Sequence, residues 1–337
     1  MNIFYLTLLI ILFNFFLYIK FDLISNSFAL FDKPDGKLKK HSKPASLIGG
    51  SLILINFYLI IFFLNLLKID NSIFDGSFLI IVITLSTLFY MVGLLDDLKN
   101  LSPNIKLLSL IFSIFFVAYL FPEINLELIK ISFLKKTYYF NDYSLLFTIL
   151  SFLLLANAIN MFDGINLQFI LFCLFVFIIF VIKGFLPLFF ILFSICFIFL
   201  AFLNFQNKVF VGDSGCYLIT AILGLTFIYQ YKNYDNFLFG DEVFLILLIP
   251  ALDMLRLFVL RIIEKKHPFK GDLNHLHHKV ENYFENKNIA VLLTICLCML
   301  PSFLIFFEFK TYYVLIISLI VYFSLILFLK IENKSEK

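Results

Sequence analysis

The sequence predicts an all-α protein that crosses a membrane many times. Of its 337 residues, 62% are hydrophobic and only 15% are charged, and the mean hydropathy is +1.01. Soluble domains are about half apolar and about a quarter charged, so a soluble fold could not bury this much apolar surface. The chain also contains repeated apolar runs close to the roughly 20 residues that a membrane-spanning helix needs.

The apolar runs extend over nearly the whole chain and predict one polytopic bundle of about 10–11 spans, a single domain of residues 1–337. The first run has no basic residues before it and no small-residue cleavage site after it, which favours a retained span over a signal peptide. The runs lie at 2–19, 46–67, 77–95, 105–122, 143–160, 165–183, 185–204, 215–231, 242–262, 289–308 and 312–330.

The basic residues predict which side of the membrane each loop faces. When the loops are assigned alternately, 18 lysines and arginines fall on the side of residues 20–43 and 7 on the other side. Because cytoplasmic loops are enriched in basic residues, we expect the N-terminus outside and the C-terminus in the cytoplasm. The net charge of only +3 argues against nucleic acid as a partner.

Polar clusters gather on the predicted cytoplasmic side, and the loops of the other side have none comparable. A transporter more often places ionisable groups near the middle of the bilayer. Clusters on one side indicate instead an enzyme that takes a substrate from the cytosol. The clusters lie at 37–43, 96–97, 157–163, 212–215 and 275–278.

Asp96 and Asp97 end the third run. Two adjacent carboxylates repel each other, and the C-terminus of a helix already carries partial negative charge. The pair therefore predicts a compensating cation, either Mg²⁺ or a basic side chain. A solvated helix end with interfacial acids is the alternative.

Asp213 lies in Val211-Gly212-Asp213-Ser214-Gly215, at the cytoplasmic start of the eighth run. The backbone N–H groups at a helix N-terminus can bind phosphate, and an aspartate can hold a metal ion. The alternative is an ordinary helix cap and turn, because Asp and Ser are favoured caps.

The segment that joins the fifth and sixth runs presents a second polar face. Asn157, Asn160 and either Asp163 or Gly164 recur at helical spacing. Amides donate and accept hydrogen bonds, which suits a sugar, a uracil ring or a metal ion, although polar packing between helices is also open. Within the ninth run, Asp253 and Arg256 are three residues apart and are expected to pair.

A basic loop and a histidine segment provide candidate phosphate contacts. The loop also fits topogenic charge and contact with anionic lipid. The histidines could bind a transition metal or form a surface cluster. The loop contains Lys37, Lys39, His41 and Lys43, and the segment contains His275, His277 and His278.

Together these motifs resemble the polyprenyl-phosphate N-acetylhexosamine-1-phosphate transferases, of the glycosyltransferase family 4 type. That family has an aspartate pair, an NAxNxxDG segment, a GDxGS turn and a histidine loop, in this order. The resemblance covers roughly residues 32–280 and leaves 289–330 as additional C-terminal spans. The histidine segment and Asp253 are similar to the branch that transfers GlcNAc-1-phosphate, rather than to the phospho-MurNAc-pentapeptide branch.

The resemblance implies transfer of an N-acetylhexosamine 1-phosphate from a UDP-sugar to undecaprenyl phosphate, with release of UMP. This reaction would begin the synthesis of a surface polysaccharide or cell-wall polymer. The resemblance also implies a bacterial inner-membrane protein with its site on the cytoplasmic face. Its cofactor would be Mg²⁺ or Mn²⁺, and a homodimer stays open.

The resemblance also suggests roles for individual residues. Asp96 would be the base for the carrier phosphate, with Asp97 and Asp163 as further catalytic residues, and Asp213 and Asn160 would hold the metal. Because a phosphate monoester is mostly dianionic at pH 7, Asp96 could equally bind metal or orient the nucleophile. The expected substrate contacts are Lys37, Lys39, His41, Lys43, Lys106, Asn157, His275, His277 and His278.

The sequence departs from the family pattern at three points, which weakens inference about the nucleotide and the sugar. Asn166-Leu167 stands where a second Asp-Gly is frequent, Leu38 replaces an arginine, and Cys216 replaces a serine. The rival predictions are a transporter of a nucleotide-sugar or lipid, and an inactive homologue. A CDP-alcohol phosphotransferase would need a dense repeated-Asp motif, which this sequence lacks.

Overall fold

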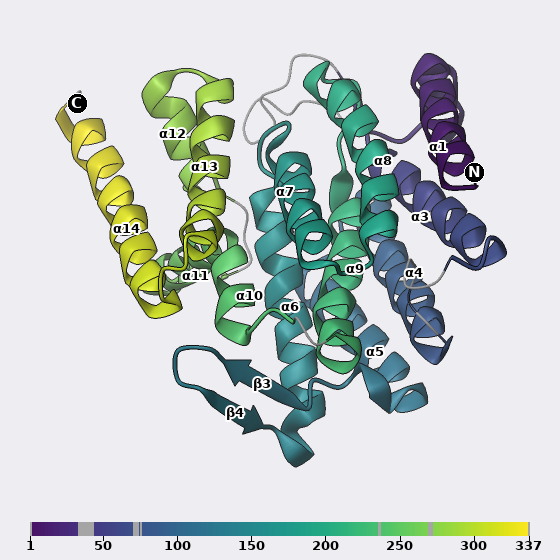
Figure 1. The fold of residues 1–337 in the computed structure, drawn as a ribbon. Coiled ribbons are helices and arrows are strands. Elements are labelled where there is room, and N and C mark those ends of the chain that lie inside the picture. Colours follow the sequence, from purple (N-terminus) through teal and green to yellow (C-terminus); the bar gives the residue numbers. More distant parts are fainter. Residues whose placement is uncertain are drawn as a thin grey trace.

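The computed structural model describes residues 2–32, 44–69, 74, 76–234, 237–268 and 272–335. In this part of the chain the strands form two short antiparallel pairs, β1 (Phe31–Asp32) with β2 (Ala45–Ser46) and β3 (Leu128–Ile131) with β4 (Lys136–Tyr139). The helices, shown in chain order in Figure 1, are α1 (Asn2–Ile19), α2 (Phe21–Phe28), α3 (Gly49–Leu66), α4 (Gly76–Lys99), α5 (Pro103–Leu120), α6 (Ser144–Phe162), α7 (Gln168–Lys183), α8 (Pro187–Phe205), α9 (Gly212–Asn233), α10 (Gly240–Ile246), α11 (Leu248–Ile263), α12 (Leu276–Phe284), α13 (Lys287–Phe306) and α14 (Thr311–Ser335).

The predicted polytopic helix bundle is confirmed. Eight of the described helices are long and apolar enough to cross a membrane, and the total is up to ten if each bent pair forms one span. The bends are 68° between α1 and α2 and 73° between α10 and α11. The run at 165–183 forms the shorter helix α7, so that the eight spans, the two bent pairs and α7 together correspond to the eleven predicted runs. The sidedness of the termini and the single-domain organisation stay predictions.

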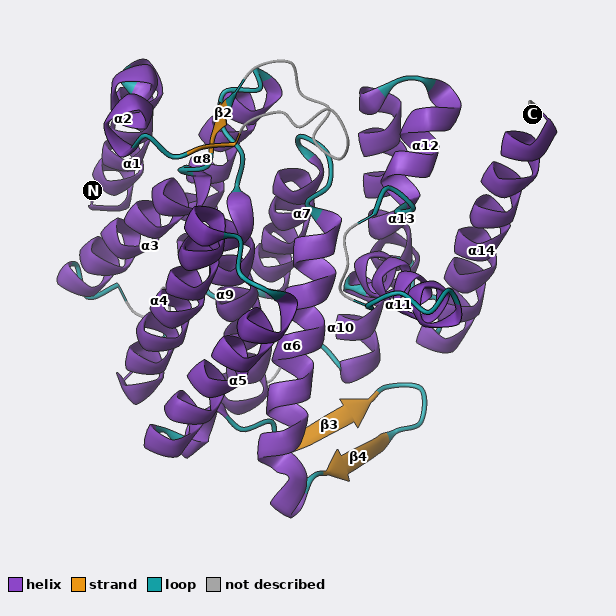
Figure 2. Cartoon of the chain, turned by 180° about the vertical axis from the view of Figure 1, so that it is seen from behind, coloured by secondary structure: helices purple, strands orange, loops and turns teal. Residues whose placement is uncertain are grey.

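Helix α9 lies at the centre of the bundle, among α3, α4 and α6 (Figures 1 and 2). Its span is 83% buried, whereas the other seven spans are 28–56% buried. Gly93 on α4 permits the close contact with α9, because a Cβ at this position would lie 2.4 Å from the backbone oxygen of Asp213. Small residues allow helix backbones to approach in this way. The C-terminal part of α4 therefore lies directly against the first turn of α9.

The other end of the bundle carries the β3–β4 hairpin (Figure 2). Asp241, in the first turn of α10, accepts hydrogen bonds from the backbone N–H of Ser132 at 2.9 Å and from the hydroxyls of Ser132 and Thr311. Ser132 follows β3 and Thr311 begins α14. This hairpin cluster (Ser132, Asp241 and Thr311) thus joins three elements that are far apart in the sequence.

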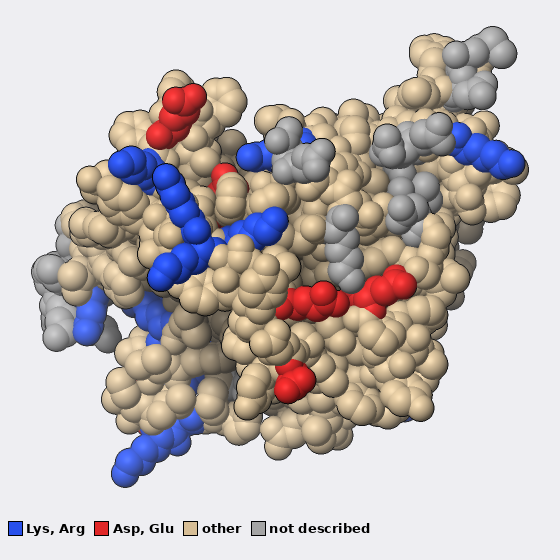
Figure 3. Space-filling view, turned by 60° about the horizontal axis from the view of Figure 1, so that its bottom comes forward, with Lys and Arg blue, Asp and Glu red and all other residues tan. Residues whose placement is uncertain are grey.

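The surface has the character expected of a protein that contacts lipid. Figure 3 shows mostly uncharged side chains, with lysines and arginines gathered mainly on one side and a row of acidic side chains near the middle. Large apolar side chains such as Phe62, Phe112 and Ile182 are exposed on α3, α5 and α7. Exposed residues of this kind are stable where the surroundings are hydrocarbon.

Candidate active site

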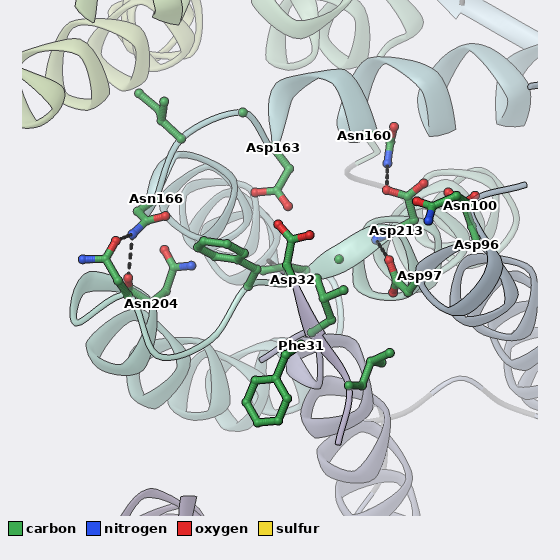
Figure 4. A pocket seen from close by; sticks show the side chains of 18 of the residues that line it. Phe31, Asp32, Asp96, Asp97, Asn100, Asn160, Asp163, Asn166, Asn204 and Asp213 are labelled. Atoms are coloured by element: carbon green, nitrogen blue, oxygen red, sulfur yellow. Dashed lines mark hydrogen bonds between the residues drawn. The ribbon is translucent and has the colours of Figure 1, made fainter. Parts of the chain in front are cut away.

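Four helix ends meet at one end of the bundle and surround a cavity of about 760 Å³ (Figure 4). α4 and α6 contribute their C-terminal ends, and α5 and α9 contribute their N-terminal ends. Six acidic side chains and two lysines line the cavity in the described part of the chain. The acids are Asp32, Asp96, Asp97, Asp163, Asp213 and Glu281, and the lysines are Lys106 and Lys287.

Asp97 holds the first turn of α9. Its Oδ1 accepts a hydrogen bond from the backbone N–H of Asp213 at 2.9 Å, and its Oδ2 accepts one from Ser214 at 3.1 Å. Gly212 has a φ of 72°, and a Cβ there would lie 2.6 Å from Oδ2 of Asp97. The backbone N–H groups of Asp213 and Ser214 already donate to the Asp97 carboxylate. The expectation that the N–H groups at this helix start contact phosphate is therefore wrong for these two groups.

Lys106 lies between two aspartates. Its Nζ contacts Oδ2 of Asp96 and donates to Oδ2 of Asp213 at 3.1 Å. The other oxygen of Asp213 accepts from the Asn160 amide at 2.7 Å, and Oδ1 of Asp96 accepts from the backbone N–H of Leu101 at 2.7 Å. The sequence predicts a compensating cation beside the aspartate pair. For Asp96 this cation is the side chain of Lys106.

Asp163 follows the last residue of α6 and faces Asp32 across the middle of the cavity (Figure 4). The thiol of Cys216 donates to Oδ2 of Asp163, at 3.6 Å. Burial raises the pKa of Asp163 to about 7, and the charges of Asp213 and Asp97 act in the same direction. Asp163 can therefore exchange a proton near neutral pH. Asp32 is not among the residues predicted from the sequence, and the signal for it is its place directly before the basic loop.

The side of the cavity opposite the Asp96, Asp97 and Asp213 group carries several neutral amides (Figure 4). The Asn166 amide nitrogen donates to the backbone oxygen of Asn204 at 2.9 Å and to Oδ1 of Asn207 at 2.7 Å. Asn204 also accepts from the backbone N–H of Leu167 at 2.6 Å. An aspartate at position 166 would place a carboxylate oxygen, which cannot donate, against the Asn204 backbone oxygen and Oδ1 of Asn207. An asparagine fits here because its amide nitrogen donates to both oxygens. Asn204 and Asn207 are not among the residues predicted from the sequence, because asparagines at helix ends give no distinctive pattern.

The histidine segment (residues 275–278) packs against the cavity from α12. A Cβ on Gly164 would lie 1.9 Å from Nε2 of His277, and Nδ1 of His277 lies 3.2 Å from the Gln168 amide nitrogen. Burial and the neighbouring His278 and His275 hold the pKa of His277 well below its usual range. His277 is therefore neutral at pH 7, which does not suit a cationic contact to phosphate.

The structure brings only some of the expected substrate contacts to the cavity. Lys106 and His278 line it. His275 instead contacts Asp253, and the Asn157 amide donates to the Leu153 backbone oxygen of its own helix at 2.7 Å. Four expected contacts lie outside the described residues; they are Lys37, Lys39, His41 and Lys43. The predicted pairing of Asp253 with Arg256 is confirmed by an ion pair of 2.7 Å.

The cavity offers the ligand chemistry that Mg²⁺ requires, which is oxygen. Mg²⁺ is usually held by one or two carboxylates together with substrate phosphates. Asp213 supplies one carboxylate, and the amide of Asn160 lies beside it. Among the described residues, no three His, Cys, Asp or Glu side chains are grouped so that they could hold a metal ion. The residues fit a metal ion that is shared with a phosphate ligand.

Residues 79–231 match the family model of glycosyl transferase family 4. An undecaprenyl-phosphate alpha-N-acetylglucosaminyl 1-phosphate transferase from Thermotoga maritima is 26% identical over 275 residues, which cover 79% of this chain and 77% of that protein. The matched region contains Asp96, Lys106, Asp163 and Asp213. Both findings support the placement of the chain in this family, as the sequence motifs predict.

Proposed function

We propose that this protein transfers an N-acetylhexosamine 1-phosphate from a UDP-sugar to undecaprenyl phosphate. The observation that carries the proposal is the cavity, in which Asp96, Lys106 and Asp213 interact on one side and neutral amides lie on the opposite side. A cavity with a charged side and a neutral side suits a UDP-sugar, because its diphosphate is charged whereas its sugar and its pyrimidine ring are neutral. The family match and the Thermotoga maritima relative support the same reaction.

In the proposed reaction an oxygen of the carrier phosphate attacks the β-phosphorus of the UDP-sugar. The bond from this phosphorus to the bridging oxygen breaks, and that oxygen leaves with UMP. Such a transfer depends mainly on alignment and charge neutralisation. Lys106 supplies a positive charge at the cavity, and Asp96 orients it. Asp97 acts through the first turn of α9, which it holds in the position that presents Asp213.

Mg²⁺ is the cofactor in this proposal, with Mn²⁺ as a substitute, and Asp213 and Asn160 would hold it. When bound there, it would neutralise charge on the diphosphate. The excess of acids over lysines around the cavity supports this requirement, because a diphosphate would otherwise be repelled. The basic loop at 37–43 provides further candidate cations.

The proposal places the protein in the bacterial inner membrane, with the cavity facing the cytoplasm, where nucleotide-sugars are available. The polyprenyl-diphosphate sugar would then begin a surface polysaccharide or cell-wall polymer. A transporter of a nucleotide-sugar or lipid is not favoured, because the charged side chains that line the cavity lie at or beyond the ends of the spans and not in their middle.

The proposal can be tested by measuring UMP release from purified protein in detergent. The reaction contains undecaprenyl phosphate, Mg²⁺ and one of a panel of UDP-HexNAc donors. We expect release that needs the lipid and stops when EDTA is added, and the donor that gives the fastest release identifies the sugar. If folded protein releases no UMP with any donor, the proposed reaction is wrong.

A further inference from the structure

The last helix contributes a buried side chain to the network behind the histidine segment. Helix α14 lies outside residues 79–231, which match the family model. Tyr322 on this helix is fully buried. Its hydroxyl donates to Oδ1 of Asp253 at 3.0 Å and accepts from Nε of Arg256 at 3.0 Å. α14 therefore contacts the ion pair of α11 through one hydroxyl group.

Asp253 in turn holds the start of α12. Its Oδ2 lies 2.9 Å from Nδ1 of His275, and its two oxygens accept from the backbone N–H of Leu276 at 3.2 and 3.3 Å. The N-cap side chain of α12 makes no capping hydrogen bond. The carboxylate of Asp253 takes this place, since an anion is favourable at a helix N-terminus.

Arg256 provides a second connection to the same segment. Its Nη2 donates to Oδ1 of Asp253 at 2.7 Å and to the backbone oxygen of Asn274 at 2.7 Å. The Tyr322 hydroxyl bridges the two charged side chains, so it restricts how they can be oriented relative to each other. Removal of this hydroxyl would leave the buried Asp253 with one donor fewer and the partly buried Arg256 with one acceptor fewer.

The orientation of α12 affects the cavity directly. His278 lines the cavity, and His277 packs against Gly164 at the end of the segment that carries Asp163. Both histidines lie in the first turn of α12, next to the residues that Asp253 holds. A rotation of that turn would move both side chains relative to Asp163.

We propose that Tyr322 is a positioning residue, whose hydroxyl keeps the Asp253–Arg256 pair in the arrangement that fixes the histidine segment against the cavity. Its effect on catalysis rests on the proposed function, whereas its effect on α12 does not. The C-terminal spans are then part of the machinery that orders the site. Tyr322 itself touches no substrate.

The structural step can be tested by hydrogen–deuterium exchange without any substrate. Tyr322→Phe removes only the hydroxyl, and Tyr313→Phe, at an exposed position on the same helix, is the matched control. We expect amide exchange across 272–284 to rise about fivefold or more in Tyr322→Phe, because this region would open locally more often. Peptides from α4 and α9, and all peptides of Tyr313→Phe, should match the wild type. Unchanged exchange across 272–284 in Tyr322→Phe would overturn the proposal.

The catalytic step can be tested with a double-mutant cycle. We expect Tyr322→Phe to lower kcat about tenfold in the wild-type background and to cause little further loss in a His278→Gln background. A purely structural loss would give the same fold reduction in both backgrounds and would contradict the positioning role. If the wild-type protein itself transfers no sugar phosphate, the proposed function fails, and the exchange measurement alone decides whether Tyr322 orders α12.

Discussion

The two ends of the bundle both contain partly buried carboxylates, but their surroundings differ. In the hairpin cluster, Asp241 accepts from Ser132 and Thr311 and ties their elements together. At the cavity end, acids outnumber lysines around an open space of about 760 Å³, and Lys106 is shared by Asp96 and Asp213. The hydrogen bonds of Asp241 hold neighbouring elements together. Among the described residues around the cavity there are more carboxylates than lysines, so some of these carboxylates are available to bind a ligand.

The largest expected difference between the two ends is in activity. Asp213→Ala should lower UMP release at least about a hundredfold, because it removes charge from the point where the phosphates and metal ion are proposed to meet. Asp241→Ala, at the other end, should keep the wild-type rate per folded molecule. Equal losses in the two variants would remove the distinction between the ends.

The two glycines that flank α7 differ in how closely other atoms surround them. Gly164→Ala places a Cβ against Nε2 of His277, whereas Gly184, at the other end of α7, has a φ of 78° and no atom within 4 Å of such a Cβ. We expect Gly164→Ala to lower kcat about tenfold by displacing the histidine segment. Gly184→Ala should cost only about 1 kcal/mol of backbone strain and leave kcat unchanged. Steady-state kinetics and thermal unfolding of both variants would separate these effects.

The hairpin cluster should affect stability and not chemistry. Asp241→Ala leaves the hydroxyls of Ser132 and Thr311 without their charged acceptor and should destabilise the protein by about 1–3 kcal/mol. A lower midpoint of thermal unfolding in detergent, with α10 and the hairpin exchanging amide hydrogens faster, would support this assignment. An unchanged midpoint would show that the cluster contributes little.

The smallest expected effect is a change in the pH dependence of stability. The pKa of His277 is lower in the folded protein than in the unfolded chain, so its contribution to stability is complete above about pH 6.5 and is lost at lower pH. The raised pKa of Asp163 acts in the opposite sense, since its contribution decreases as the pH rises from about 4 to 7. Because the two effects oppose each other, the contribution of His277 is measured as the difference in pH dependence between the wild type and the His277→Gln variant. Wild type should lose more thermal stability than this variant between pH 7.5 and 5.5, and equal losses would contradict the assignment.

The fold class could be predicted because long apolar runs are a strong signal, and every run corresponds to a helix or a bent pair of helices. The bend between α10 and α11 was not predicted, since residues 242–262 form one continuous apolar run. Pro250 was the available signal, because a proline in the first turn of a helix clashes with continuation from the preceding residues. The bend between α1 and α2 has no glycine or proline to indicate it.

The site could be predicted in part for a similar reason. Charged residues at the ends of apolar runs stand out, and this selected Asp96, Asp163 and Asp213, all of which line the cavity. The side chains that these residues contact could not be predicted from the sequence in the same way. That Lys106 is shared by two aspartates, and that Asn204 and Asn207 lie against Asn166, depends on how the helix ends pack and not on their spacing in the sequence.

We infer that transfer to a lipid takes place at the cavity end of the bundle. The most direct test is mass spectrometry of the lipid fraction after incubation of the protein with undecaprenyl phosphate, a UDP-HexNAc and Mg²⁺. We expect undecaprenyl diphosphate linked to one HexNAc with the wild type and with Asp241→Ala, and none with Asp213→Ala or with EDTA present. The same lipid product from Asp213→Ala at the wild-type level, or uptake of the donor into vesicles without any lipid product, would contradict the account.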